Sequence, residues 1–102
     1  MGMLHIVNKS PFERNTLDSC VRLAGDGASL LLIEDGVYGA VNGNAKAQDL
    51  KNKLGNVKLY VLGPDLEARG MAEDQLIDGV SVVDYGGFVD LVTEHDKVQS
   101  WL

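Results

Sequence analysis

Residues 29–40, SLLLIEDGVYGA, decide the fold of this chain. Four apolar residues in succession, Leu30 to Ile33, follow a glycine-containing turn and end at the Glu-Asp-Gly turn of residues 34–36. A strand with one face in water alternates apolar and polar residues, whereas a continuous apolar run bounded by turns indicates a strand covered on both faces. The acidic turn also stands beyond the carboxyl end of the strand, where the sites of open α/β sheets tend to lie.

The segments on both sides of this run predict more strands. The candidates are residues 4–7, 57–62 and 80–83, and the tail 98–102 is a candidate edge strand in which Trp101 packs. Strands alternate with helices, without a repeat or a linker, and this order is typical of βαβ units. We therefore expect an α/β fold in three layers, with a mostly parallel sheet of four to five strands flanked by helices. A single domain spanning residues 1–102 is expected to form it, with residues 29–33 at the centre of the sheet.

Helix signals fall between these strands. Ser10-Pro11-Phe12-Glu13 combines an N-cap, a proline at the first helical position and a capping box, and it predicts a helix over 10–24. Further helices are expected over 45–54 and, after Pro64, over 65–69, with one helical turn near 37–41. Asp84 is expected to cap a final helix whose buried face includes Phe88, Leu91 and Val92.

Charge and composition exclude several classes of function. The chain has 102 residues and a formal net charge of −6, which argues against direct nucleic-acid binding because phosphate neutralisation needs a basic surface. The N-terminus lacks the basic and long apolar regions of a signal peptide, and no apolar run is long enough to span a membrane. The single cysteine permits no internal disulfide and suits a reducing compartment. We expect a cytoplasmic protein without a membrane association.

Motifs for a cofactor or a metal ion are not found. The glycines at 25 and 27 precede a strand instead of following one, and no P-loop occurs, so no nucleotide cofactor is expected. His5 and His95 stand at opposite ends of the chain, which gives no metal-ligand spacing. We expect His5 to be a strand histidine satisfied by a neighbour and His95 to lie on a solvated helix end. Asp35 is read as part of a turn in preference to a phospho-acceptor, because no lysine directly follows a later strand.

Cys20 is the one residue with distinctive chemistry. A thiolate can attack a sulfane sulfur and carry it as a persulfide, which requires partial exposure and a lowered pKa. Cys20 stands in the second half of its predicted helix, at helical spacing with Leu17, Val21 and Ala24. The helix dipole therefore does not lower the pKa of the Cys20 thiol, and the spacing alone favours a buried structural cysteine over a reactive one.

Several segments together resemble the DsrH/TusB family across essentially the full length of the chain. They are Leu4-His5, residues 8–12, 32–40, 58–70 and 84–91, and the closing Val98-Gln99-Ser100-Trp101. The resemblance implies a small α/β subunit of a cytoplasmic sulfur relay, without a cofactor or a metal. It further implies a hexamer with DsrE/TusD-like and DsrF/TusC-like subunits, two copies of each, which passes sulfur to a DsrC/TusE-like acceptor. The Tus branch serves 2-thiouridine synthesis at the tRNA wobble position, and the Dsr branch serves oxidation of stored sulfur.

The resemblance leaves two hypotheses for this chain. A cysteine in the first helix makes this chain resemble members of the DsrH branch, so Cys20 is a candidate accessory sulfur carrier. The resemblance also implies that the main persulfide-forming cysteine of such complexes belongs to the DsrE/TusD-like subunit. Alternatively, the chain is a non-catalytic structural subunit that completes and positions the hetero-oligomer, with Cys20 in its core. Homo-oligomers of the isolated chain are a third, weaker expectation.

Overall fold

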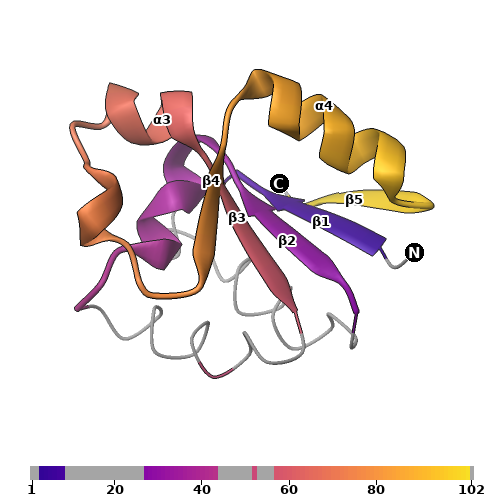
Figure 1. Cartoon of the computed structure of the whole chain (residues 1–102), viewed down its shortest axis with the longest axis horizontal. Helices are drawn as coiled ribbons and strands as arrows, with labels where there is room; N and C mark the ends of the chain where they lie inside the picture. The colour runs from indigo at the N-terminus through magenta and orange to yellow at the C-terminus, as the bar shows by residue number, and fades with distance from the viewer. Residues whose placement is uncertain (1–2, 9–26, 44–51, 53–56, 102) are drawn as a thin grey trace.

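The sheet consists of five parallel strands in the order β4-β3-β2-β1-β5 (Figure 1). The computed structural model describes residues 3–8, 27–43, 52 and 57–101. The strands are β1 (Met3–Val7), β2 (Ser29–Leu32), β3 (Lys58–Leu62), β4 (Val80–Val83) and β5 (Lys97–Trp101). The predicted α/β fold with a parallel sheet is confirmed, and the apolar run that begins at Leu30 does form the central strand.

Four helical elements are described. They are the 3-10 helix η1 (Glu34–Ala40), α3 (Gly63–Ala68), the 3-10 helix η2 (Glu73–Gln75) and α4 (Tyr85–Glu94). The predicted turn at 34–36 and the helical turn at 37–41 are one element, because the Gly36 N–H donates to the Ile33 carbonyl at 2.8 Å and starts the 3-10 pattern. The predicted helices over 10–24 and 45–54 lie outside the described residues, apart from Asn52. None of the described helices has the length and apolar character needed to span a membrane.

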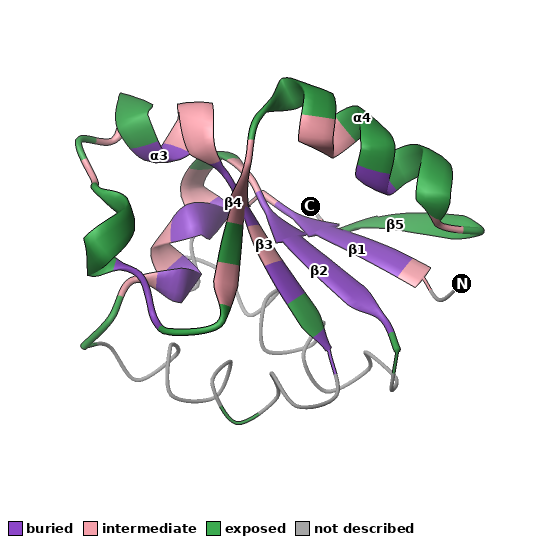
Figure 2. Cartoon of the chain, in the orientation of Figure 1, coloured by how far each residue is buried: buried purple, intermediate pink, exposed green. Residues whose placement is uncertain are grey.

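Apolar side chains pack against both faces of the central strand. Leu30 and Leu32 belong to a cluster on one face, together with side chains from η1 and α3, whereas Leu31 joins a second cluster on the face that α4 covers. All three leucines are almost completely buried, and Figure 2 shows β1 and β2 buried along most of their length. This two-sided burial is what the uninterrupted apolar run predicts.

Helix α4 begins as predicted and covers the sheet with a narrow face. The Asp84 side chain accepts a hydrogen bond from the Gly87 N–H at 2.8 Å, which satisfies a free donor of the first turn. Leu91 is buried and Phe88 half-buried, but the prediction that Val92 is buried is wrong, since it is 37% exposed. Successive residues turn by about 100° around a helix, so Val92 lies beyond the edge of the inward face that Leu91 occupies.

His5 and Trp101 join the edge strand β5 to β1. The indole Nε1–H of Trp101 donates to Nδ1 of His5 at 3.0 Å, and the two ring centroids are 6.0 Å apart. The predictions of a satisfied strand histidine and of a packing tryptophan are both confirmed. Burial disfavours the charged imidazolium and lowers the pKa of His5 below its ordinary value.

His95 is more enclosed than predicted, because it is half-buried at the end of α4. Its Nδ1 lies 2.7 Å from the Leu91 carbonyl oxygen, which can only accept, so Nδ1 carries the proton of that hydrogen bond. Its Nε2 lies 2.9 Å from Oγ of the buried Ser29 at the start of β2. The imidazole therefore ties the end of α4 to the central strand.

Candidate functional site

The carboxyl ends of β2 and β3 carry η1 and α3, which lie at the same end of the sheet (Figure 1). Arg69, which follows α3, reaches across to Asp35 of η1. Its Nε donates to Asp35 Oδ1 at 3.0 Å, and its Nη2 lies 2.9 Å from the same oxygen. Its remaining Nη1 donates to the Asp65 carbonyl at 3.1 Å, so the guanidinium is held on both sides.

A second contact joins the same two elements. The backbone N–H of Glu34 donates to Oδ2 of Asp65 at 2.7 Å. Glu34 has φ +48°, a left-handed conformation that costs a non-glycine residue of order 1 kcal/mol and persists where the surroundings fix it. The Asp65 carboxylate and the neighbouring ion pair supply that fixation, and the Glu34 side chain remains exposed at the edge of the sheet.

Gly36 sets how closely η1 approaches β1. A Cβ at this position would overlap the carbonyl oxygen of Val7 and lie 3.0 Å from its carbonyl carbon. The same Val7 oxygen accepts a hydrogen bond from the Ile33 N–H at 3.0 Å. Only glycine therefore fits between the end of β1 and the start of η1 in this arrangement.

Asn8 adds an unusual polar atom to this edge. Its side-chain oxygen is buried and has no hydrogen-bond donor within the part of the chain that the structure describes. An acceptor in that state costs about 1–3 kcal/mol relative to one that is paired.

The charged groups of the edge hold the turn together: Arg69 pairs with Asp35, and the Asp65 carboxylate accepts the backbone N–H of Glu34. The Asp35 side chain is 49% exposed, so its pairing with Arg69 contributes at most about 1 kcal/mol and serves mainly to hold the turn. Asp84 accepts the Gly87 N–H and so serves as the cap of α4. Among residues 3–8, 27–43, 52 and 57–101, no group of three or more metal-ligating side chains occurs. The interpretation of Asp35 as a structural residue agrees with its engagement by Arg69.

Sequence reasoning missed the roles of Arg69 and Asp65. Arg69 stands 34 residues beyond Asp35, and only the pairing of β2 with β3 brings them together. The available signal was that two neighbouring parallel strands end in acidic turns and that an arginine follows the second one. Cys20, the predicted site residue, lies outside the described residues, so its role stays a prediction.

Comparisons with known proteins point to one family. A family model described as "DsrH like protein" matches residues 9–98. Protein TusB of Pectobacterium parmentieri is 41% identical over 101 residues, covering 97% of this chain and 100% of the relative. Protein TusB of Escherichia coli strain K12 is 36% identical over 99 residues, with the same coverage of both chains.

Solved structures share the fold at lower identity. The crystal structure of the ychN protein from E. coli has a TM-score of 0.82 and 23% identity, and the match covers 99% of this chain and 100% of that one. The structure of MTH1491, a protein of unknown function from Methanobacterium thermoautotrophicum, has a TM-score of 0.74 and 24% identity, covering 95% and 96% of the two chains.

Proposed function

Because the chain belongs to the DsrH-like protein family, we propose that it is a subunit of a sulfur relay complex serving thiolation of the tRNA wobble uridine. The family predicted from the sequence is thereby confirmed. The observation that carries the proposal is the match to TusB proteins over 97% of the chain. The sulfur travels as a persulfide in the cytoplasm and reaches tRNA through other proteins, in keeping with the acidic charge of this chain.

The partners we propose are TusC-like and TusD-like subunits, in a hexamer with two copies of each chain, and a TusE-like protein as the sulfur acceptor. An exposed apolar stripe on α4 supports such an assembly. Tyr85, Val89 and Val92 follow one another at helical spacing and are 60%, 60% and 37% exposed. Large exposed apolar groups gathered on one helix face mark a contact surface more often than a solvated one. This stripe is the surface that we assign to a partner subunit.

Cys20 is proposed as an accessory sulfur carrier within this complex. Its thiolate attacks the outer sulfur of a persulfide on a donor cysteine, and a new S–S bond forms as the donor S–S bond breaks. The donor leaves as a thiolate, so one sulfur atom moves without net oxidation or reduction. Because Cys20 lies in the first predicted helix, a role in the DsrH branch is a second candidate function. There the same transfer of sulfur would serve sulfur oxidation.

The alternative role for this chain is structural. The helical spacing of Cys20 with apolar residues supports a core position, and the ion pair of Asp35 with Arg69, which joins η1 to α3, supports a positioning role. Replacement of Cys20 by serine in the complex separates the two. If assembly is intact and sulfur transfer to the acceptor falls sharply, Cys20 carries sulfur; if transfer is unchanged, the chain acts as a structural subunit.

Reconstitution tests the proposal as a whole. This chain is co-expressed with its TusC-like and TusD-like partners, and the acceptor is then analysed by mass spectrometry after addition of a sulfane-sulfur donor. The proposal predicts a stable complex and an acceptor heavier by ~32 Da, the mass of one sulfur atom added to a thiol. A complex that forms and transfers sulfur equally well without this chain would refute it.

A further inference from the structure

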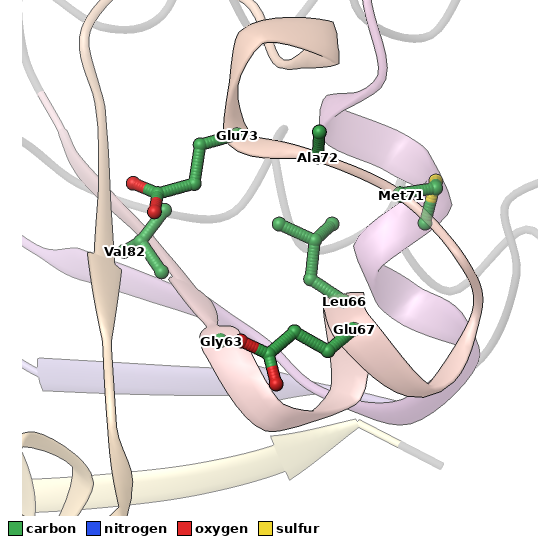
Figure 3. A pocket seen from close by; sticks show the side chains of 7 residues that line it. All are labelled: Gly63, Leu66, Glu67, Met71, Ala72, Glu73 and Val82. Carbon is green, nitrogen blue, oxygen red and sulfur yellow. The ribbon is translucent and has the colours of Figure 1, made fainter.

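A pocket of about 240 Å³ opens between α3, η2 and β4, and Figure 3 shows the side chains around it. Leu66, Met71 and Val82 supply apolar surface, and the Leu66 side chain points into the space between them. Glu67 and Glu73 place carboxylates at its border from two different elements. Both glutamates are exposed, whereas Leu66 is buried beneath them. The pocket therefore combines an apolar base with a negative border.

The two carboxylates have no cation partner among the described residues. Arg69 is the nearest cationic residue in the sequence, but its Nε and Nη2 contact Asp35 and its Nη1 donates to the Asp65 carbonyl. The arginine is thus held at the carboxyl edge of the sheet and does not neutralise the pocket. Negative charge beside a concave apolar surface attracts a cation more strongly than the same charge on a flat surface does.

The border of the pocket is held by local hydrogen bonds. The Met71 N–H donates to the Leu66 carbonyl at 3.1 Å, which closes α3 beneath the pocket. On the other side, the Ala72 N–H donates to Oε1 of Gln75 at 2.7 Å and fixes the start of η2, where Glu73 stands. The glutamates therefore extend from backbone that is already ordered, which lowers the entropy cost of binding.

We propose that this pocket binds a lysine or arginine side chain of a partner polypeptide. The methylene stem of such a side chain packs on the half-buried Met71 and Val82, above the buried Leu66, and its charged head reaches the carboxylates of Glu67 and Glu73. Pockets for small-molecule ligands typically measure about 300–1,000 Å³, so a space of about 240 Å³ suits one side chain better than a whole metabolite. The pocket requires only a polypeptide with a basic side chain. The proposal for the pocket and the proposal of a sulfur relay function can therefore be refuted independently of each other.

The test is a titration of the full-length chain with the capped tripeptides acetyl-Gly-Arg-Gly-amide and acetyl-Gly-Lys-Gly-amide. The signal is the methyl NMR resonance of Met71, which is assigned with the variant M71L because the chain has only three methionines. We expect a saturable shift of this resonance with at least one basic peptide. The double variant E67Q/E73Q is expected to weaken binding about tenfold, and each single variant about threefold. The control D78N/E94Q makes the same charge change at exposed positions away from the pocket and is expected to bind like the wild type.

Comparison ligands distinguish the proposed occupant from other occupants. The norleucine tripeptide keeps the stem and lacks the charge, and it is expected to bind about tenfold more weakly than the better basic peptide. Spermidine tests whether a free amine fills the pocket in place of a polypeptide side chain. Four results would each overturn the proposal. They are the absence of a Met71 shift with both basic peptides, binding by E67Q/E73Q as tight as that of the wild type, binding of the norleucine peptide as tight as that of the basic peptides, and tighter binding of spermidine than of the peptides. Circular dichroism verifies that the variants fold, and the single variants replace the double variant if it does not.

Discussion

Replacement of Gly36 by alanine tests the contact that fixes η1 against β1. The added Cβ would overlap the Val7 carbonyl oxygen and lie 3.0 Å from the carbonyl carbon. Both atoms are backbone, so no side-chain rotation can relieve the overlap. The Val7 oxygen also accepts from the Ile33 N–H at 3.0 Å, and moving it away from residue 36 strains that hydrogen bond. Overpacking costs about 1–3 kcal/mol and a weakened hydrogen bond about 1 kcal/mol, so we expect a loss of about 2–4 kcal/mol in the free energy of unfolding.

Urea unfolding followed by the fluorescence of Trp101 measures this loss, since the chain has a single tryptophan. A lower midpoint with an unchanged slope reports a change in stability. Gly86→Ala is the matched control, because its nearest neighbour is Oδ1 of Asp84 at 3.3 Å and residue 86 stands in the first turn of α4. The control is expected to lie within about 1 kcal/mol of the wild type, because alanine favours a helix but its Cβ crowds the oxygen that caps α4. A Gly36→Ala protein within about 0.5 kcal/mol of wild type would refute the close approach of η1 to β1.

The remaining predictions concern the ion pair, the buried histidine and the apolar stripe. Arg69→Lys should lower the free energy of unfolding by about 1 kcal/mol or less, since lysine cannot contact Asp35 and the Asp65 carbonyl at the same time. A double-mutant cycle with Asp35→Asn measures the coupling energy between residues 69 and 35, and a coupling energy of zero would contradict the prediction. His5 should titrate with a pKa below its ordinary 6.5 when it is followed by NMR. The neutral form of His5 therefore contributes stability that is complete above about pH 6.5 and declines as the pH falls below that value. A titration midpoint at or above 6.5 would contradict this prediction. Val89→Asp should weaken the complex with partner subunits, as measured by size-exclusion chromatography, and leave the free energy of unfolding nearly unchanged, because Val89 is 60% exposed. Glu94→Gln on the same helix is the control, and an intact Val89→Asp complex would show that this face of α4 is not the contact surface.

Features that depend on short stretches of sequence were predictable. The run from Leu30 to Ile33 identified the central strand, because continuous apolar residues need cover on both faces whatever the neighbours are. Asp84 was identified as a cap, because its side chain satisfies an N–H only three residues away. In both cases the residues that form the structure are adjacent in the sequence.

Features that depend on distant residues were not predictable in the same way. Asp35 contacts Arg69 only because β2 and β3 are neighbours, and His95 is half-buried because Ser29, 66 residues earlier, lies beneath it. Val92 shows a different limit: its apolar character suits a helix face, but the sequence does not determine how far the sheet extends beneath α4. The pocket beside Glu67 likewise depends on the packing of three separate elements.

The central claim is that this chain works in a sulfur relay that ends in tRNA thiolation. The most direct test is mass spectrometry of nucleosides from cells that carry the chain, before and after deletion of its gene and after its return. The account predicts that wobble 2-thiouridine falls on deletion and is restored by the wild-type chain. An unchanged content of 2-thiouridine in the deletion strain would contradict the claim.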